Sequence, residues 1–237
     1  MKKLLVSVLV MLAISTATFA VPGLFDGATG GLMVKSGTVT KAPVVSTYVY
    51  NDMFGDWNTI TLFNNIQAAF PAGKLVKGLD DFELSTALYD LSGGFNSYSI
   101  GAKYALPLGL EELSVAAGIN YWEFIPVNEP TTDIYAAATY DFGELPLAVS
   151  GNLGYNFDIK DVYFGLNAEY DFGKITAGIE YMSEVSFLGD DSRVNIYATT
   201  SNDKGLGVTA ALVDISGDGS WFYDKGAKAM LGLNYTF

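Results

Sequence analysis

The sequence predicts an all-β protein, a closed antiparallel transmembrane β-barrel of about twelve strands. Three observations lead to this fold class: an export leader, apolar residues at every second position through most of the chain, and tight glycine turns that alternate with long acidic connections. Apolar residues make up 50% of the chain. After residue 20 no apolar run approaches the length of a membrane-spanning helix, so a membrane protein of this composition must cross with strands.

Residues 1–20 have the pattern of a signal peptide. Lys2 and Lys3 form the positive start, an apolar stretch follows, and small residues up to Ala20 form a cleavage site. The apolar stretch is shorter than the roughly 20 residues of a spanning helix, which argues against a membrane anchor. Without the two leader lysines, 11 basic residues face 26 acidic ones, a net charge of −15. This charge disfavours nucleic acid as a partner and favours cations.

The period-two pattern is clear in VYFGLNAEYDF (162–172), where one phase is apolar and the other carries Tyr, Gly, Asn, Glu and Asp. Successive strand residues point to opposite faces, so the segment has one apolar and one polar side. The polar sides of such segments are rich in small residues that fit inside a barrel. We expect strands at residues 44–51, 59–70, 82–90, 98–107, 112–121, 133–142, 147–157, 162–172, 174–182, 193–201, 206–214 and 227–237.

The number of strands depends on how the N-terminal part of the mature chain is assigned. LMVKSGTVT (32–40) also has strand character, but bacterial single-chain barrels use even numbers of strands. We therefore predict that residues 21–43 form an N-terminal segment, either at the periplasmic base or as a plug inside the barrel. Residues 44–237 then form the transmembrane barrel, with ten or fourteen strands as the alternatives to twelve.

The connections between the expected strands favour closure. YDFGE (140–144) and YDFGK (170–174) are near copies, in which Gly143 and Gly173 can take the positive φ of a tight turn. Longer, acidic connections lie between the turns. Short and long connections mostly alternate, as expected when turns face the periplasm and loops face outside. The connection at 71–81 is an exception, because it is long but falls on the periplasmic side.

Aromatic residues gather near the strand ends, as expected for two girdles at the lipid–water interfaces. The general enrichment of aromatic residues in strands is the alternative explanation. The periplasmic girdle would comprise Tyr104, Tyr140, Phe142, Tyr170, Phe172, Tyr235 and Phe237. The outer girdle would comprise Trp57, Tyr121, Trp122, Tyr155, Phe157, Tyr181 and Trp221.

The chain ends on AMLGLNYTF, in which apolar residues alternate up to a terminal phenylalanine. Together with the leader and the paired YDFG turns, this strand resembles those of bacterial outer-membrane β-barrel proteins of the porin-like kind. The resemblance implies the bacterial outer membrane as the location, the lipid bilayer as a partner, and a last strand read by the barrel-insertion machinery. The matching membrane-insertion residues are Leu231, Leu233, Tyr235 and Phe237. We expect this strand to pair with the first strand and remove both edges.

The composition argues against an enzyme. The chain has no histidine and no cysteine, so a Ser–His–Asp triad and a thiolate metal site are excluded. DISGDGSWFYDK (214–225) begins like a calcium loop, but Lys225 stands where the bidentate glutamate is needed. We expect no catalytic residue, no cofactor and no dedicated metal site. Small cations or divalent ions bound weakly at the acidic loops are the ionic partners that this charge pattern allows.

The polar phases of the strands predict the residues that line the lumen: Lys103, Asn152, Asn167, Glu169, Asp171, Glu180, Arg193 and Lys228. Charges on an inner wall either pair and fill the lumen or line a wet path that selects ions. Acidic loops would also concentrate cations at the outer mouth. We expect a passive pore for ions or small solutes that mildly favours cations. The alternative is a closed structural or surface-interaction barrel that binds an envelope partner.

Overall fold

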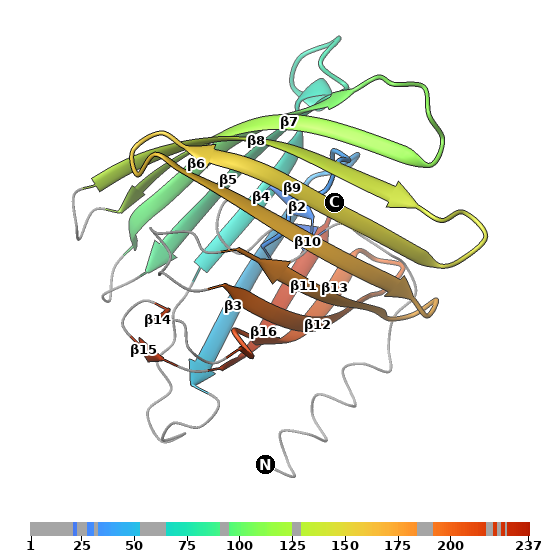
Figure 1. The fold of residues 1–237 in the computed structure, drawn as a ribbon. Helices are drawn as coiled ribbons and strands as arrows, with labels where there is room; N and C mark the ends of the chain where they lie inside the picture. The colour runs from blue at the N-terminus through green and yellow to red at the C-terminus, as the bar shows by residue number, and fades with distance from the viewer. Residues whose placement is uncertain are drawn as a thin grey trace.

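The computed structural model describes residues 21–22, 28–30, 33–52, 65–90, 95–124, 129–183, 192–216, 220–221, 224–225 and 227–237. These residues form a closed barrel of antiparallel strands (Figure 1). Two pairs of two-residue strands are separate from the wall: β1 (Val21–Pro22) with β2 (Thr29–Gly30), and β14 (Ser220–Trp221) with β15 (Asp224–Lys225). One short 3-10 helix, η1 (Ala72–Lys74), is present in the described ranges, where no helix is long and apolar enough to cross a membrane.

Twelve strands make the wall, which confirms the predicted fold class and strand number. Each strand of the wall is hydrogen-bonded to the wall strands that precede and follow it in the sequence. The strands are β3 (Val44–Asp52), β4 (Asn65–Pro71), β5 (Phe82–Asp90), β6 (Phe95–Leu106), β7 (Leu113–Phe124), β8 (Glu129–Asp141), β9 (Leu147–Asn156), β10 (Asp161–Asp171), β11 (Thr176–Met182), β12 (Arg193–Ser201), β13 (Leu206–Val213) and β16 (Lys228–Thr236).

The wall closes between its first and last strands, as the C-terminal pattern predicts. β16 pairs with β3 from Lys228 opposite Asp52 to Thr236 opposite Val44. Beyond this pairing, the Phe237 amide donates to the Pro43 carbonyl at 3.0 Å. Closure pairs the backbone polar groups of every strand with a neighbour, which the hydrocarbon of a bilayer requires.

The strand boundaries differ from the predicted ones by a few residues. Of the strand expected at 59–70, the structure describes the part in β4, Asn65–Pro71, and residues 59–64 lie outside the described ranges. LMVKSGTVT (32–40) is not a strand of the wall. Its described residues, 33–40, hold a single isolated bridge, between Lys35 and Gly30.

The barrel is apolar outside and polar inside. On β10, Val162, Phe164 and Leu166 are exposed, whereas Tyr163 and Asn167 are buried. The other strands repeat this arrangement, so most large exposed side chains of the wall are apolar and many buried ones are polar. Water-soluble proteins bury the apolar phase instead. A closed wall with this outer surface suits the interior of a lipid bilayer.

The two YDFG turns adopt the same local structure. Gly143 has φ +61° and Gly173 has φ +87°, as the sequence predicts. In each turn the preceding aspartate accepts a hydrogen bond from the glycine amide, at 3.0 Å for Asp141 and 2.6 Å for Asp171. Gly109 and Gly205 also have positive φ in connections at this end of the barrel. We term it the turn end, and the opposite end the loop end.

Aromatic rings form contacts at both ends of the wall. At the turn end, the rings of Tyr140 and Phe142 lie 4.9 Å apart and those of Tyr235 and Phe237 lie 4.8 Å apart. At the loop end, Tyr155 and Phe157 have ring centroids 5.3 Å apart. All of these rings are exposed except that of Tyr155, which is half-buried, and they stand where the sequence predicts girdles.

The assignment of Trp122 to the outer girdle is wrong. Trp122 is buried, and its Nε1 donates to Asp133 inside the barrel at 2.9 Å. Its neighbour Tyr121 is exposed on the outside. Adjacent strand residues point to opposite faces, so both could not face lipid. Trp57 and the side chain of Trp221 are outside the described part of the structure.

Candidate functional site in the barrel lumen

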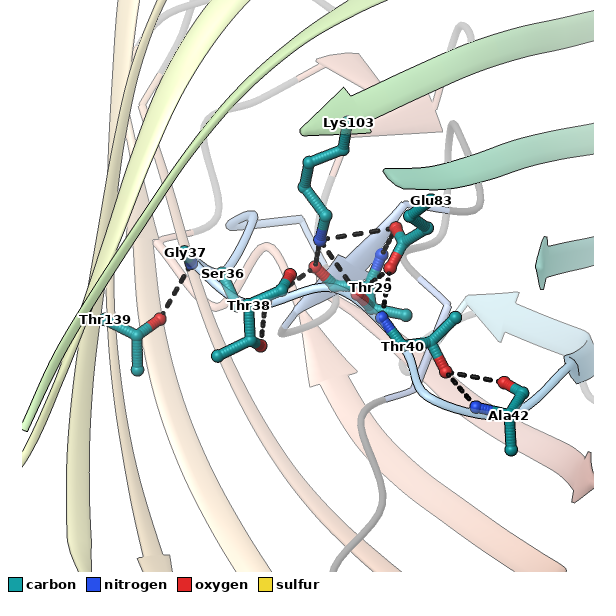
Figure 2. Close-up of polar contacts among 9 residues, drawn as sticks. All are labelled: Thr29, Ser36, Gly37, Thr38, Thr40, Ala42, Glu83, Lys103 and Thr139. Atoms are coloured by element: carbon teal, nitrogen blue, oxygen red, sulfur yellow. Dashed lines mark hydrogen bonds and ion pairs between the residues drawn. The ribbon is translucent and has the colours of Figure 1, made fainter. Parts of the chain in front are cut away.

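Part of the N-terminal segment lies inside the barrel. We name residues 28–30 and 33–42 the inner loop. Its two limbs run side by side, because the Ser36 amide donates to the Thr29 carbonyl at 3.2 Å and Lys35 bridges to Gly30. Residues 33–37 are all buried, Lys35 included, with 6% of its surface exposed. Wall side chains hold both limbs (Figure 2).

Both limbs meet at a buried ion pair near the turn end. Glu83 of β5 and Lys103 of β6 are 0% and 1% exposed, with Lys103 Nζ 3.3 Å from Glu83 Oε1. The Glu83 carboxylate accepts hydrogen bonds from the Thr29 amide at 2.9 Å, the Thr29 hydroxyl at 2.5 Å and the Thr40 amide at 2.8 Å. Lys103 Nζ donates to the carbonyl and hydroxyl oxygens of Thr29 (Figure 2). Charged groups make such hydrogen bonds stronger than neutral ones.

A second carboxylate holds the tip of the inner loop on the opposite wall. Glu180 lies on β11, six strands away from β5 in a ring of twelve. Its oxygens accept hydrogen bonds from the amides of Met33, at 3.0 and 3.2 Å, and Val34, at 3.3 Å. Asn195 Nδ2 donates to the same carboxylate at 2.9 Å. The inner loop therefore crosses the lumen from Glu83 to Glu180.

The strands β8 and β9 hold the middle of the inner loop. Asn152 Oδ1 accepts a hydrogen bond from the Lys35 amide at 3.3 Å, and the Thr139 hydroxyl accepts one from the Gly37 amide at 2.9 Å. Backbone groups buried away from water need such partners. The polar inner face of the wall supplies them.

Four tyrosine side chains on the inner face lie across glycines of the adjacent strand. At each glycine an added Cβ would fall 2.1–2.4 Å from an atom of the tyrosine ring. The ring can therefore lie in this position only because glycine has no side chain. The pairs, directly opposite one another in register, are Gly118–Tyr135, Gly154–Tyr163, Gly178–Tyr197 and Gly232–Tyr48.

The structure places most of the predicted lumen residues on the buried side of the wall. The buried ones are Lys103, Asn152, Asn167, Glu180, Arg193 and Lys228. Three of them contact the inner loop, as described above. Asn167 and the half-buried Glu169 meet at the hydroxyl of Tyr197, which donates to Glu169 at 2.6 Å and accepts from Asn167 Nδ2 at 2.9 Å. Asp171 is half-buried at the turn end, where it accepts the Gly173 amide.

Sequence reasoning missed four charged residues of the interior: Lys35, Glu83, Asp133 and Asp214, the last of which it placed only in the calcium-like run. Glu83 and Asp133 lie on the inward phase of β5 and β8, so period two could have found them. Glu83 was overlooked because its segment alternates poorly, and Asp133 because it begins the predicted strand 133–142. Lys35 belongs to no regular strand, and its position had no sequence signal.

The described residues hold no group of three or more carboxylates that could bind a metal ion. The calcium-like run at 214–225 is described only in part, and Asp218 lies outside the described ranges. Asp214 is buried, and its amide donates to Asn195 Oδ1 at 2.8 Å.

No protein-family model and no curated protein matches this sequence. Solved structures of outer-membrane proteins share its fold. The KdgM porin in complex with disordered oligogalacturonate superposes with a TM-score of 0.60 at 14% identity, over 82% of this chain and 99% of that one. The KdgM porin alone gives 0.57 at 15% identity, with the same coverage. Omp33 of Acinetobacter baumannii gives 0.53 at 13% identity, over 84% of this chain and 100% of that one. The chain is a closed β-barrel with the fold of outer-membrane porins, as its turns and C-terminal strand predict.

Proposed function

We propose that this protein is a channel of the bacterial outer membrane that passes ions or small solutes passively. The observation that carries the proposal is the closed wall with an apolar outside and a polar inside. Such a wall is stable in lipid and encloses a hydrophilic path. The porin fold of KdgM and Omp33 supports the same function.

The C-terminal strand supports the outer-membrane location. Leu233, Tyr235 and Phe237 are exposed on the outside of the barrel, and Leu231 is half-buried on the same phase. These four residues form the insertion signal in this proposal, and the lipid bilayer covers them once the barrel is assembled. Separation of inner and outer membranes on a sucrose gradient tests the location. Recovery in the soluble or inner-membrane fraction would contradict it.

The inner loop is the constriction of the proposed channel. It spans the lumen between opposite walls, and the wall side chains that hold its two ends, Glu83 and Glu180, are 0% and 1% exposed. The width of the path then depends on the position of this loop. Its described contacts with the wall are hydrogen bonds to side chains, among them Glu83, Thr139 and Glu180, and none of them is part of the backbone pairing that closes the wall.

The charges support a preference for cations. Among the described residues, buried acidic and basic side chains are equal in number, with Glu83, Asp133, Glu180 and Asp214 against Lys35, Lys103, Arg193 and Lys228. Glu169 and Asp171 add two half-buried carboxylates on the inner phase. Together with a mature net charge of −15, they make the path more favourable for cations than for anions.

Single-channel recording of the purified protein in planar lipid bilayers tests the proposal. We expect stepwise openings whose reversal potential in a salt gradient shows a mild cation preference. Glu169→Gln with Asp171→Asn should reduce the preference, whereas Glu144→Gln on an exposed turn should not. Folded protein that never conducts would contradict the proposal. It would favour a closed structural barrel, which the fully buried polar side chains around the inner loop also support.

A further inference from the structure

An aromatic cage lies inside the barrel, formed by Tyr135 of β8, Tyr163 of β10 and the carboxylate of Asp133. We propose that this cage is a binding site for solutes that carry an organic ammonium group. In the structure the cage is occupied by the ammonium group of Lys35, a residue of the inner loop, which takes the position proposed for the ammonium group of the solute. The proposal rests on the proposed channel function only for the route by which a solute arrives.

The position of Lys35 shows what the cage accepts. Its Nζ lies 4.6 Å from the centroid of the Tyr135 ring and 5.6 Å from that of Tyr163. Both distances are within the roughly 6 Å at which an aromatic face attracts a cation. The two tyrosines and Lys35 are 4%, 5% and 6% exposed. The attraction is stronger at such a desolvated site than at the surface.

The wall alone fixes the two rings and the carboxylate. Gly154 of β9 stands opposite both Tyr135 and Tyr163, so no side chain separates the two tyrosines. Across this gap the Tyr163 hydroxyl donates to Asp133 Oδ2 at 2.5 Å. Trp122 Nε1 donates to Asp133 Oδ1 at 2.9 Å. The cage is therefore preorganised by strands β7 to β10, without any group of the inner loop.

The occupant, in contrast, belongs to the inner loop. Lys35 is attached to the wall through its amide, which donates to Asn152 Oδ1 at 3.3 Å. A shift of the inner loop would withdraw the ammonium and leave two ring faces beside the buried Asp133. That site favours an organic ammonium over a small metal ion, because aromatic faces attract ammonium groups, whereas hard metal ions prefer several oxygen ligands. An anionic solute would meet the Asp133 carboxylate and be repelled.

Replacement of Lys35 by alanine tests the site with n-butylammonium chloride, which reproduces the lost side chain. Binding is followed through the fluorescence of Trp122 in a Trp57→Phe, Trp221→Phe background, since the chain has three tryptophans. We expect Lys35→Ala to bind n-butylammonium at least about tenfold more tightly than the Lys35 protein. Lys77→Ala, which removes an exposed lysine, should behave like the parent, and uncharged 1-butanol should not bind comparably.

Two further variants test the role of the ring. Lys35→Ala with Tyr135→Phe keeps an aromatic face and should keep the affinity. Lys35→Ala with Tyr135→Leu should lose about tenfold. Equal affinity of these two variants, or of Lys35→Ala and the parent, would overturn the proposal. Lys35→Ser replaces Lys35→Ala throughout if the alanine variant does not fold.

Potassium currents separate this proposal from the channel function. In planar bilayers n-butylammonium should reduce the current of Lys35→Ala at lower concentration than that of the parent. Binding in the fluorescence assay with no current in any variant would retain the site and refute the channel. Current without tighter binding in Lys35→Ala would retain the channel and refute the site.

Discussion

The replacement Glu83→Gln probes how firmly the wall holds the inner loop. Glu83 receives three hydrogen bonds from Thr29 and Thr40 and forms the ion pair with Lys103, and all four residues are buried. Glutamine has nearly the same shape but no charge, and it offers one acceptor oxygen in place of two. The change therefore leaves the buried Lys103 ammonium without its counter-charge.

The cost follows from these contacts. Removal of one partner of a buried ion pair typically costs about 3–5 kcal/mol, because the other charge remains buried and uncompensated. Lys103 keeps its contacts with the carbonyl and hydroxyl oxygens of Thr29, which compensate part of the lost interaction. We therefore expect Glu83→Gln to lower the free energy of unfolding by about 3 kcal/mol, the lower end of this range. The exposed control Glu144→Gln should change the stability by less than about 0.5 kcal/mol.

Urea unfolding in lipid vesicles, followed by tryptophan fluorescence, measures these free energies. Lys103→Met and the double variant complete a mutant cycle. The double variant should cost at least about 1 kcal/mol less than the sum of the single changes, because it removes both charges together. A cost below about 1 kcal/mol for Glu83→Gln, together with additive single and double variants, would refute the assignment of Glu83 and Lys103 as a coupled buried pair.

Three other changes test the wall. Gly154→Ala would place a Cβ 2.1 Å from Cζ of Tyr163, so it should lower the free energy of unfolding in urea by about 2–3 kcal/mol. The control Gly151→Ala places its Cβ near an outward side chain and should lower it by less. Leu153→Arg puts a charge on the outer face and should cost about 2–4 kcal/mol in vesicles; no loss of stability would exclude contact with lipid. Phe237→Ala should lower the yield of assembled barrel in cells without slowing refolding in detergent, and equal yields would remove Phe237 from the insertion signal.

The wall could be predicted because its signals are local. Alternation within each segment decides which side chains face out, and turns such as those at Gly143 and Gly173 carry their own glycine. The closing pair of strands followed from the C-terminal alternation. Trp122 was assigned wrongly because its nearness to a strand end was given more weight than its phase. In a strand, the phase decides which face a side chain takes.

The contents of the lumen could not be predicted in the same way. The inner loop is held by residues far away in sequence, because Glu83 follows Thr29 by 54 positions and Glu180 follows Met33 by 147. Charge and phase identify Glu180 as an inward residue, but they do not say what it contacts. The contact of Lys35 with two tyrosine rings likewise depends on the closed barrel, which brings β8 and β10 to the same side of the loop.

Single-channel conductance of the mature protein and of a variant without residues 21–42 shows whether a polar lumen runs through the closed barrel and whether the inner loop narrows it. Heat-modifiable migration in gels confirms that both proteins are folded barrels. We expect stepwise, cation-favouring currents in both, with a larger conductance for the variant. Folded barrels that conduct equally, or that never conduct, would contradict this expectation.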